Sequence, residues 1–272
     1  MLTRAISGAV FVSLLVFSIC YSPITFLGLF YLFMLVSVFE FSRMLQLKSV
    51  GVYIITTLLY GSSILSSWGM TSYYTDTFAI LGILFVFAAC VFEKNSNSIS
   101  QLGAILLCIV YAGMPFIFIS KIPFTTSNNS YEGILILGVF VLIWANDTFA
   151  YLTGMSIGKH KLLERISPKK TIEGFIGGVV ATLIISYLLA LQFQIITPLH
   201  WMIIGVLVAI FGVIGDLIAS MFKRQTGVKD TGNIIPGHGG VLDRLDSIIF
   251  AAPFIYLYLK FITEHVSERR KC

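Results

Sequence analysis

Residues 200–222 read HWMIIGVLVAIFGVIGDLIASMF, with the carboxylate of Asp216 and no Lys or Arg. A helix needs about 20 predominantly apolar residues to cross the hydrocarbon core of a bilayer, so this stretch predicts a transmembrane helix. The composition of the whole chain agrees, because 57% of its 272 residues are hydrophobic and only 11% are charged. Its mean hydropathy is +0.92. We therefore expect an integral membrane protein rather than a water-soluble globule.

Windows of the same kind recur along the chain and predict an all-α, polytopic membrane protein with about nine transmembrane helices. They cover residues 5–21, 23–41, 50–68, 77–92, 102–119, 133–153, 171–192, 200–222 and 245–262. No small-residue cleavage site follows the first window, so we expect this window to be a retained helix rather than a signal peptide. The 14% aromatic content argues against disorder, and four scattered cysteines argue against a disulfide scaffold.

The net charge of +5 is explained by a membrane setting and does not indicate nucleic acid. With nine spans, the N-terminus and the loops after every second span share one side, which holds most of the 18 Lys and Arg residues. The positive-inside rule makes this side cytoplasmic. Four basic residues near the C-terminus oppose this assignment, and they are Lys260, Arg269, Arg270 and Lys271.

Polar residues are unevenly distributed between the two halves. Up to residue 119 the predicted spans are nearly uniform in Leu, Ile, Val, Phe and Ser and hold no acid that we expect to be buried. Residues 1–130 are therefore expected to form a transmembrane scaffold. Polar and glycine-rich blocks interrupt the apolar runs from Trp144 onward. Residues 131–272 are expected to carry the active site, at the cytoplasmic side of the C-terminal helices.

The first polar block, WANDTFAYLTGMSIGK, covers residues 144–159. On a helix, Asp147, Tyr151, Gly154 and Gly158 would form one stripe. An acid within a membrane span is costly and commonly functional, so Asp147 is a candidate substrate-binding residue. The alternative is an ion pair that locks two helices, with the glycines allowing close packing.

The second block, SPKKTIEG, covers residues 167–174. Ser167 is expected to cap a helix whose first residue is proline, and the free N–H groups of such a helix start can bind phosphate. Glu173 is interpreted as an orienting group for the two lysines. The candidate substrate-binding residues are Ser167, Lys169, Lys170, Thr171 and Glu173. The alternative is a capped helix with an ordinary basic flank.

The third block, residues 215–246, carries most of the functional signal. At the end of one predicted helix Asp216, Ser220 and Lys223 share a face, and at the start of the next Asp243 and Asp246 are three residues apart. One loop joins the two helices, so we expect these carboxylates to converge. Mg²⁺ is held by one or two carboxylates together with water and substrate phosphates. Asp216, Asp243 and Asp246 are therefore candidate metal ligands; the alternative is a set of salt bridges that stabilises the loop.

Basic and polar side chains accompany these acids and are candidates to act on phosphate groups. They are Lys223, Arg224, Lys229, Asp230, His238 and Arg244. His238 lies in the sequence PGHGG, where it could donate to a leaving phosphate or fix the loop. The sequence contains no zinc-type His and Cys spacing, no P-loop and no Rossmann fingerprint.

The third block resembles the phosphatidate cytidylyltransferase family, the CDP-diacylglycerol synthases of bacterial type. Residues 220–246 match the family signature S-x-x-K-R-x4-K-D followed by P-G-H-G-G-x-x-D-R-x-D at every fixed position. The resemblance implies conversion of CTP and phosphatidate to CDP-diacylglycerol and pyrophosphate, with a divalent metal, Mg²⁺ and possibly a second ion. It also implies a multi-pass homodimer in the inner membrane of a bacterium, with the active site facing the cytoplasm. Asp216 and Asp243 match the acids that hold the metal centre, and residues 220–230 match the catalytic region.

Two other functions agree with parts of the pattern. A CTP-dependent polyprenol or lipid-alcohol kinase would use the same nucleotide and metal but would transfer the γ-phosphate and release CDP. A membrane transporter would also place acids and glycines within helices. Against a transporter, the acids lie near one membrane face rather than at the midplane, and the two halves show no internal repeat.

Overall fold

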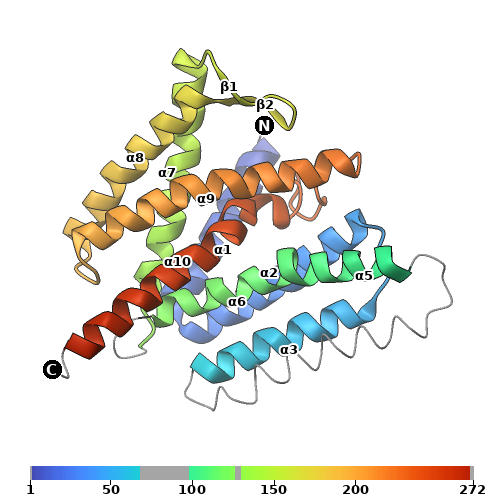
Figure 1. The fold of residues 1–272 in the computed structure, drawn as a ribbon, viewed down its shortest axis with the longest axis horizontal. Coiled ribbons are helices and arrows are strands. Elements are labelled where there is room, and N and C mark those ends of the chain that lie inside the picture. The colour runs from blue at the N-terminus through green and yellow to red at the C-terminus, as the bar shows by residue number, and fades with distance from the viewer. Residues whose placement is uncertain (1, 68–97, 126–129, 270–272) are drawn as a thin grey trace. The chain divides into compact units, whose positions relative to one another are not determined.

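The computed structural model describes residues 2–67, 98–125 and 130–269, and nearly all of them are helical (Figure 1). The chain divides into two compact units. Unit 1 contains Met1–Phe124 and Asp230–Arg244, and unit 2 contains Thr125–Lys229 and Leu245–Cys272. The C-terminal loop that precedes the last helix therefore groups with the N-terminal helices. The expected functional division at residue 130 stays a prediction.

The all-α membrane architecture is confirmed. Within the described part of the chain, seven helices are long and apolar enough to cross a bilayer, namely Thr3–Tyr21, Pro23–Met44, Ile99–Phe124, Gly133–Ile157, Ile172–Gln192, Pro198–Gln225 and Leu242–Thr263. The window 50–68 corresponds to a shorter apolar helix, Val50–Leu65. The window 77–92 lies outside the described residues, so the count of nine stays a prediction.

Unit 1 begins with helices α1 (Leu2–Tyr21) and α2 (Pro23–Met44), which a single residue separates. Ser22 is extended, and its side chain accepts a hydrogen bond from the N–H group of Thr25, whose side chain accepts one from the N–H group of Ser22. Pro23 has no N–H group and therefore suits the first helical position. This reciprocal capping explains how two predicted spans follow each other without a loop.

The rest of unit 1 contains α3 (Val50–Ser67) and a long interrupted helix. The interrupted helix consists of α5 (Ser98–Leu107), the π-helical turn η1 (Cys108–Gly113), α6 (Met114–Lys121) and the 3₁₀ turn η2 (Ile122–Phe124). In the π-turn the Met114 N–H group donates to the carbonyl of Ile109, five residues earlier. The wide turn ends two residues before Pro115, which cannot donate a backbone hydrogen bond.

Unit 2 is built on α7 (Gly133–Ile157), α8 (Ile172–Gln192) and α9 (Pro198–Gln225), followed by most of α10 (Leu242–Arg269). Glycines allow α7 and α8 to approach closely. A Cβ atom on Gly174 would lie 2.6 Å from the carbonyl oxygen of Ala150, and one on Gly178 would lie 2.6 Å from Oδ1 of Asn146. Small residues at such positions let membrane helices pack backbone to backbone.

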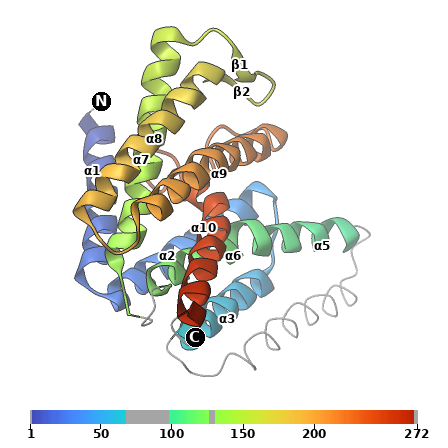
Figure 2. The same ribbon diagram turned by 60° about the vertical axis from the view of Figure 1, so that its left-hand side comes forward.

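A short antiparallel hairpin connects α7 to α8 and lies at one end of both helices (Figures 1 and 2). Its strands are β1 (Lys161–Leu163) and β2 (Ser167–Thr171). The prediction that Ser167 caps a helix is therefore wrong, because Ser167 begins a strand. Thr171 is the N-cap of α8, and its side chain accepts a hydrogen bond from the N–H group of Gly174.

Candidate functional site

An ion pair joins the hairpin to α9 within unit 2. Nζ of Lys170 in β2 lies 2.5 Å from Oδ2 of Asp216. The hydroxyl of Ser220, one turn later on α9, donates to Oδ1 of Asp216 at 3.3 Å. Lys170 and Asp216 are partly exposed, at 27% and 33% of their side-chain surface. The pair therefore stays accessible to an incoming anion or cation.

Asp246 adds a second carboxylate to this cluster from α10. It interacts electrostatically with Asp216 on α9, Asp147 on α7 and Lys223 on α9. Gly215 allows this approach, because a Cβ atom there would lie 2.5 Å from the carbonyl oxygen of Asp246. We call Asp147, Lys170, Asp216, Lys223 and Asp246 the acid–lysine cluster. Three helices and the hairpin supply its members, and all five were candidates from the sequence.

The other candidate residues near the hairpin have structural contacts of their own. Glu173 accepts hydrogen bonds from the N–H groups of Lys159 and His160, and its Oε1 lies 2.6 Å from Nδ1 of His160. Glu173 thus holds the start of the hairpin rather than Lys169 or Lys170. Of the two lysines, Lys169 is exposed and Lys170 points to Asp216.

The remaining basic candidates lie at the surface around the loop between α9 and α10. Arg224 and Lys229 are exposed in unit 2, whereas Asp230 and Arg244 are exposed in unit 1. Their roles in phosphate binding stay predictions.

The loop of residues 230–241 is held in unit 1 by Asp243, at the start of α10. Oδ2 of Asp243 accepts from the N–H groups of Thr231 and Gly240, at 2.8 and 3.0 Å, and from the Thr231 hydroxyl at 3.0 Å. Gly237 and Gly239 have φ angles of +74° and +88°, which other residues rarely adopt. Asp243 is buried and therefore organises this loop, whether or not it also binds a metal.

His238 is oriented by the N-terminal helix. Its Nδ1 lies 2.9 Å from Oγ of Ser7, and that hydroxyl lies 2.8 Å from the carbonyl oxygen of Pro236 and 3.1 Å from that of Arg4. Ser7 therefore contacts both the His238 ring and the backbone of the loop that carries it. These contacts hold the ring in one orientation against α1.

Glu40 in α2 is a buried acid that the sequence reading missed. It is only 1% exposed and accepts hydrogen bonds from the N–H groups of Val241 and Leu242 at 3.1 and 2.9 Å. The expectation that the N-terminal spans hold no buried acid is therefore wrong. The sequence did hold a signal for Glu40, because it lies within the predicted span 23–41. A carboxylate at such a position is costly unless it faces the protein interior.

The described residues contain no group of three or more His, Cys, Asp and Glu side chains arranged to hold a metal ion. The acid–lysine cluster nevertheless suits Mg²⁺ chemically. This ion needs only one or two protein carboxylates when phosphate oxygens and water complete its shell. Asp216 and Asp246 provide two, and they interact electrostatically. The donor set therefore fits a metal that arrives with a polyphosphate.

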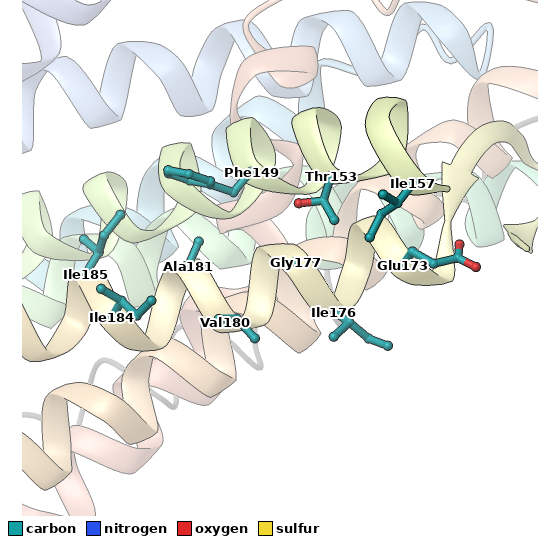
Figure 3. A pocket seen from close by; sticks show the side chains of 10 residues that line it. All are labelled: Phe149, Thr153, Ile157, Glu173, Ile176, Gly177, Val180, Ala181, Ile184 and Ile185. Atoms are coloured by element: carbon teal, nitrogen blue, oxygen red, sulfur yellow. The ribbon is translucent and has the colours of Figure 1, made fainter. Parts of the chain in front are cut away.

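An apolar groove of about 510 Å³ lies between α7 and α8 (Figure 3). Phe149 and Ile157 line it from α7, and Ile176 and Ile184 line it from α8. Glu173 is the only candidate site residue among the described residues that line it. The polar chemistry therefore lies outside this groove.

Comparison with known proteins links the whole chain to one family. The model of the cytidylyltransferase family matches residues 2–262. A phosphatidate cytidylyltransferase of Bacillus subtilis (strain 168) is 35% identical over 265 residues, which cover 94% of this chain and 96% of that protein.

Two staphylococcal relatives match a shorter region. Phosphatidate cytidylyltransferase of Staphylococcus aureus (strain COL) is 44% identical over 177 residues, 64% of this chain and 65% of the relative. The corresponding protein of Staphylococcus epidermidis (strain RP62A) is 41% identical over 180 residues, with the same coverage. The match to the Bacillus protein thus covers more of the chain than the two staphylococcal matches do.

Proposed function

Because this chain belongs to the cytidylyltransferase family, we propose that it transfers the cytidylyl group of CTP to phosphatidate, giving CDP-diacylglycerol and pyrophosphate for phospholipid biosynthesis. The resemblance of residues 220–246 to the family signature thus agrees with the comparisons over nearly the whole chain. The observation in the structure that supports the proposal most is the acid–lysine cluster, which combines carboxylates for a cation with lysines for phosphate.

Mg²⁺ is the proposed cofactor. Asp216 and Asp246 would hold it, and Asp243, one turn before Asp246 on α10, is the third proposed ligand. Bound Mg²⁺ would offset the negative charge of the triphosphate and favour departure of pyrophosphate. A second metal ion is part of the same proposal, because two-metal sites are common among enzymes that displace phosphate groups.

The basic side chains would bring two anionic substrates together. Lys170 and Lys223 lie in the acid–lysine cluster, and Lys169, Arg224, Lys229 and Arg244 are further proposed ligands of the phosphate oxygens. Arg and Lys form charge-assisted hydrogen bonds with phosphate. Asp147, Ser167, Thr171, Glu173 and Ser220 would shape the substrate site, with Asp230 and His238 contributed by the glycine-rich loop.

The transfer itself would be a direct displacement. A phosphate oxygen of phosphatidate attacks the α-phosphorus of CTP, the new P–O bond forms, and the bond to the β-phosphate oxygen breaks to release pyrophosphate. A phosphate monoester has a second pKa of about 6, so the attacking group is already largely dianionic at neutral pH. No strong general base on the protein is required.

The membrane setting suits a lipid substrate. The apolar helices and the bacterial relatives indicate a multi-pass membrane protein. We place the active site on the cytoplasmic side, where CTP is made, in the plasma membrane of a bacterium, and we propose that the chain forms a homodimer. Phosphatidate would keep its acyl chains in the bilayer while its headgroup reaches the acid–lysine cluster.

The test is a panel of acceptor lipids with purified protein in detergent, CTP and Mg²⁺. Phosphatidate should support pyrophosphate release, whereas a polyprenol, diacylglycerol or no lipid should not. Release of CDP with the polyprenol instead would indicate a lipid-alcohol kinase and would contradict the proposal. Folded protein that turns over none of these acceptors would also contradict it.

A further inference from the structure

Glu40 is a buried carboxylate for which the proposed chemistry gives no role. Its Oε1 accepts a hydrogen bond from the N–H group of Val241, and its Oε2 accepts one from that of Leu242. These groups lie at the start of α10, where the first N–H groups of a helix have no acceptor within the helix. Glu40 from α2 therefore caps α10 across unit 1, in the place usually taken by a neighbouring side chain.

The same carboxylate also reaches the glycine-rich loop. The Thr231 hydroxyl lies 3.3 Å from Oε2 of Glu40 and 3.0 Å from Oδ2 of Asp243. Because this hydroxyl has one proton, it donates to one carboxylate at a time and links the two acids. A Cβ atom on Gly232 would lie 2.6 Å from Oε1 of Glu40, so the loop approaches this carboxylate closely.

We propose that Glu40 is a positioning residue for cytidylyl transfer, which holds the start of α10 and the glycine-rich loop so that Asp243 keeps its orientation. This inference rests on the proposed function. Glu40 acts through two backbone N–H groups and Thr231. It is buried, and the N–H groups that it holds follow it by 201 and 202 residues in the sequence. A charged acceptor suits this place because the helix start carries partial positive charge.

The change Glu40→Gln tests the role with almost no change in volume. The carboxamide keeps one acceptor oxygen and presents an NH₂ group to the other backbone donor, so one hydrogen bond is lost and two donors face each other. We expect kcat to fall about 100-fold, as small displacements of reacting groups can cause. The KM for CTP should stay within about twofold, because the loss does not remove a substrate contact.

Three further variants separate positioning from general stability. Glu40→Ala removes both oxygens, whereas Glu40→Asp keeps them on a shorter side chain and should recover part of the kcat that Glu40→Ala loses. Ser37→Ala changes another fully buried residue of α2, one turn earlier, and should keep kcat within about twofold. Each kcat is measured on monodisperse, folded protein beside the wild type.

Folded Glu40→Gln protein with wild-type kcat overturns the proposal, as does an equal loss in the Ser37→Ala control. If Glu40→Gln does not fold, amide hydrogen exchange of the wild type decides instead. The Val241 and Leu242 amides should exchange much more slowly than that of Leu199, which lies in the first turn of α9, where the structure shows no side-chain cap. Equal exchange overturns the proposal.

Wild-type protein without cytidylyl transfer would refute the proposed function. Slow exchange of the Val241 and Leu242 amides would still agree with the capping of α10 by Glu40.

Discussion

The ammonium group of Lys170 lies 2.5 Å from Oδ2 of Asp216, so a lysine from the hairpin occupies one oxygen of a proposed metal ligand. Lys170 and a metal ion would compete for the same charge. If CTP binds as we propose, its phosphate oxygens would offer Lys170 a new partner, and Asp216 would become available to the cation. The proposed metal–nucleotide complex would then replace an ion pair that is already in place.

Replacement of Lys170 should therefore change the metal dependence in a specific direction. In Lys170→Gln the competing cation is gone, so the Mg²⁺ concentration for half-maximal activity should fall about fivefold, the effect of roughly 1 kcal/mol for a partly exposed pair. Its kcat/KM for CTP should also fall, because a phosphate ligand is lost. Lys169→Gln, at the exposed neighbouring position, should leave the Mg²⁺ dependence unchanged. Initial rates measured over a range of Mg²⁺ concentrations give the Mg²⁺ dependence of both variants. Equal shifts in the half-maximal Mg²⁺ concentration would refute competition between Lys170 and the metal for Asp216.

Removal of either of the two carboxylates that we propose for the metal should abolish most activity without unfolding the protein. We expect Asp216→Asn and Asp246→Asn to lower kcat about 100-fold or more, because metal sites depend steeply on ligand charge and orientation. Chelation of divalent ions should stop the wild type, and added Mg²⁺ should restore it. Glu164→Gln, an exposed acid in the hairpin turn, is the matched control. Wild-type rates in both variants would show that neither Asp216 nor Asp246 holds the metal.

The close crossing of α7 and α8 predicts a difference between two glycines. In Gly174→Ala the new methyl group would meet the carbonyl oxygen of Ala150, and the strain should cost about 1–3 kcal/mol. Gly28→Ala on α2 meets no atom within 4 Å, so better helix propensity should leave stability unchanged or raise it by up to about 1 kcal/mol. Thermal unfolding in detergent compares the two. A lower Tm for Gly28→Ala than for Gly174→Ala would contradict this packing.

The contact between Ser7 and His238 predicts a modest role for α1 in activity. Ser7→Ala removes the hydrogen-bond partner of Nδ1 of His238, so the ring loses its fixed orientation. We expect kcat to fall about fivefold, as the loss of one hydrogen bond of about 1 kcal/mol would give. Ser13→Ala, at an exposed position of the same helix, should leave kcat unchanged. If the two variants behave alike, orientation of His238 by Ser7 has no part in turnover.

The sequence predicted the membrane helices well because their signal is local. Uniform apolar runs specify spanning helices whatever their neighbours are, and the break at Ser22 was visible from Pro23. The members of the acid–lysine cluster were also found, since charged residues that interrupt or border apolar runs stand out in the sequence. Their assignment to metal and phosphate stays a prediction, because the contacts that would prove it involve substrates.

The errors arose where a residue's role depends on a partner outside its own short stretch of sequence. SPKK was expected to begin a helix, but Ser167 pairs in a hairpin and the cap falls at Thr171. Glu40 was overlooked because its partners, Val241 and Leu242, follow about 200 residues later. A single-sequence pattern carries no information about such pairs, although the cost of a buried acid was a warning.

The most direct test of cytidylyl transfer follows the fate of two labels. Purified protein is supplied with phosphatidate, Mg²⁺ and CTP that carries radioactive phosphorus at either the α or the γ position. Our account predicts that α-label enters the lipid as CDP-diacylglycerol while γ-label leaves as pyrophosphate, and that Asp246→Asn abolishes both. Entry of γ-label into lipid, with α-label recovered in CDP, would contradict it.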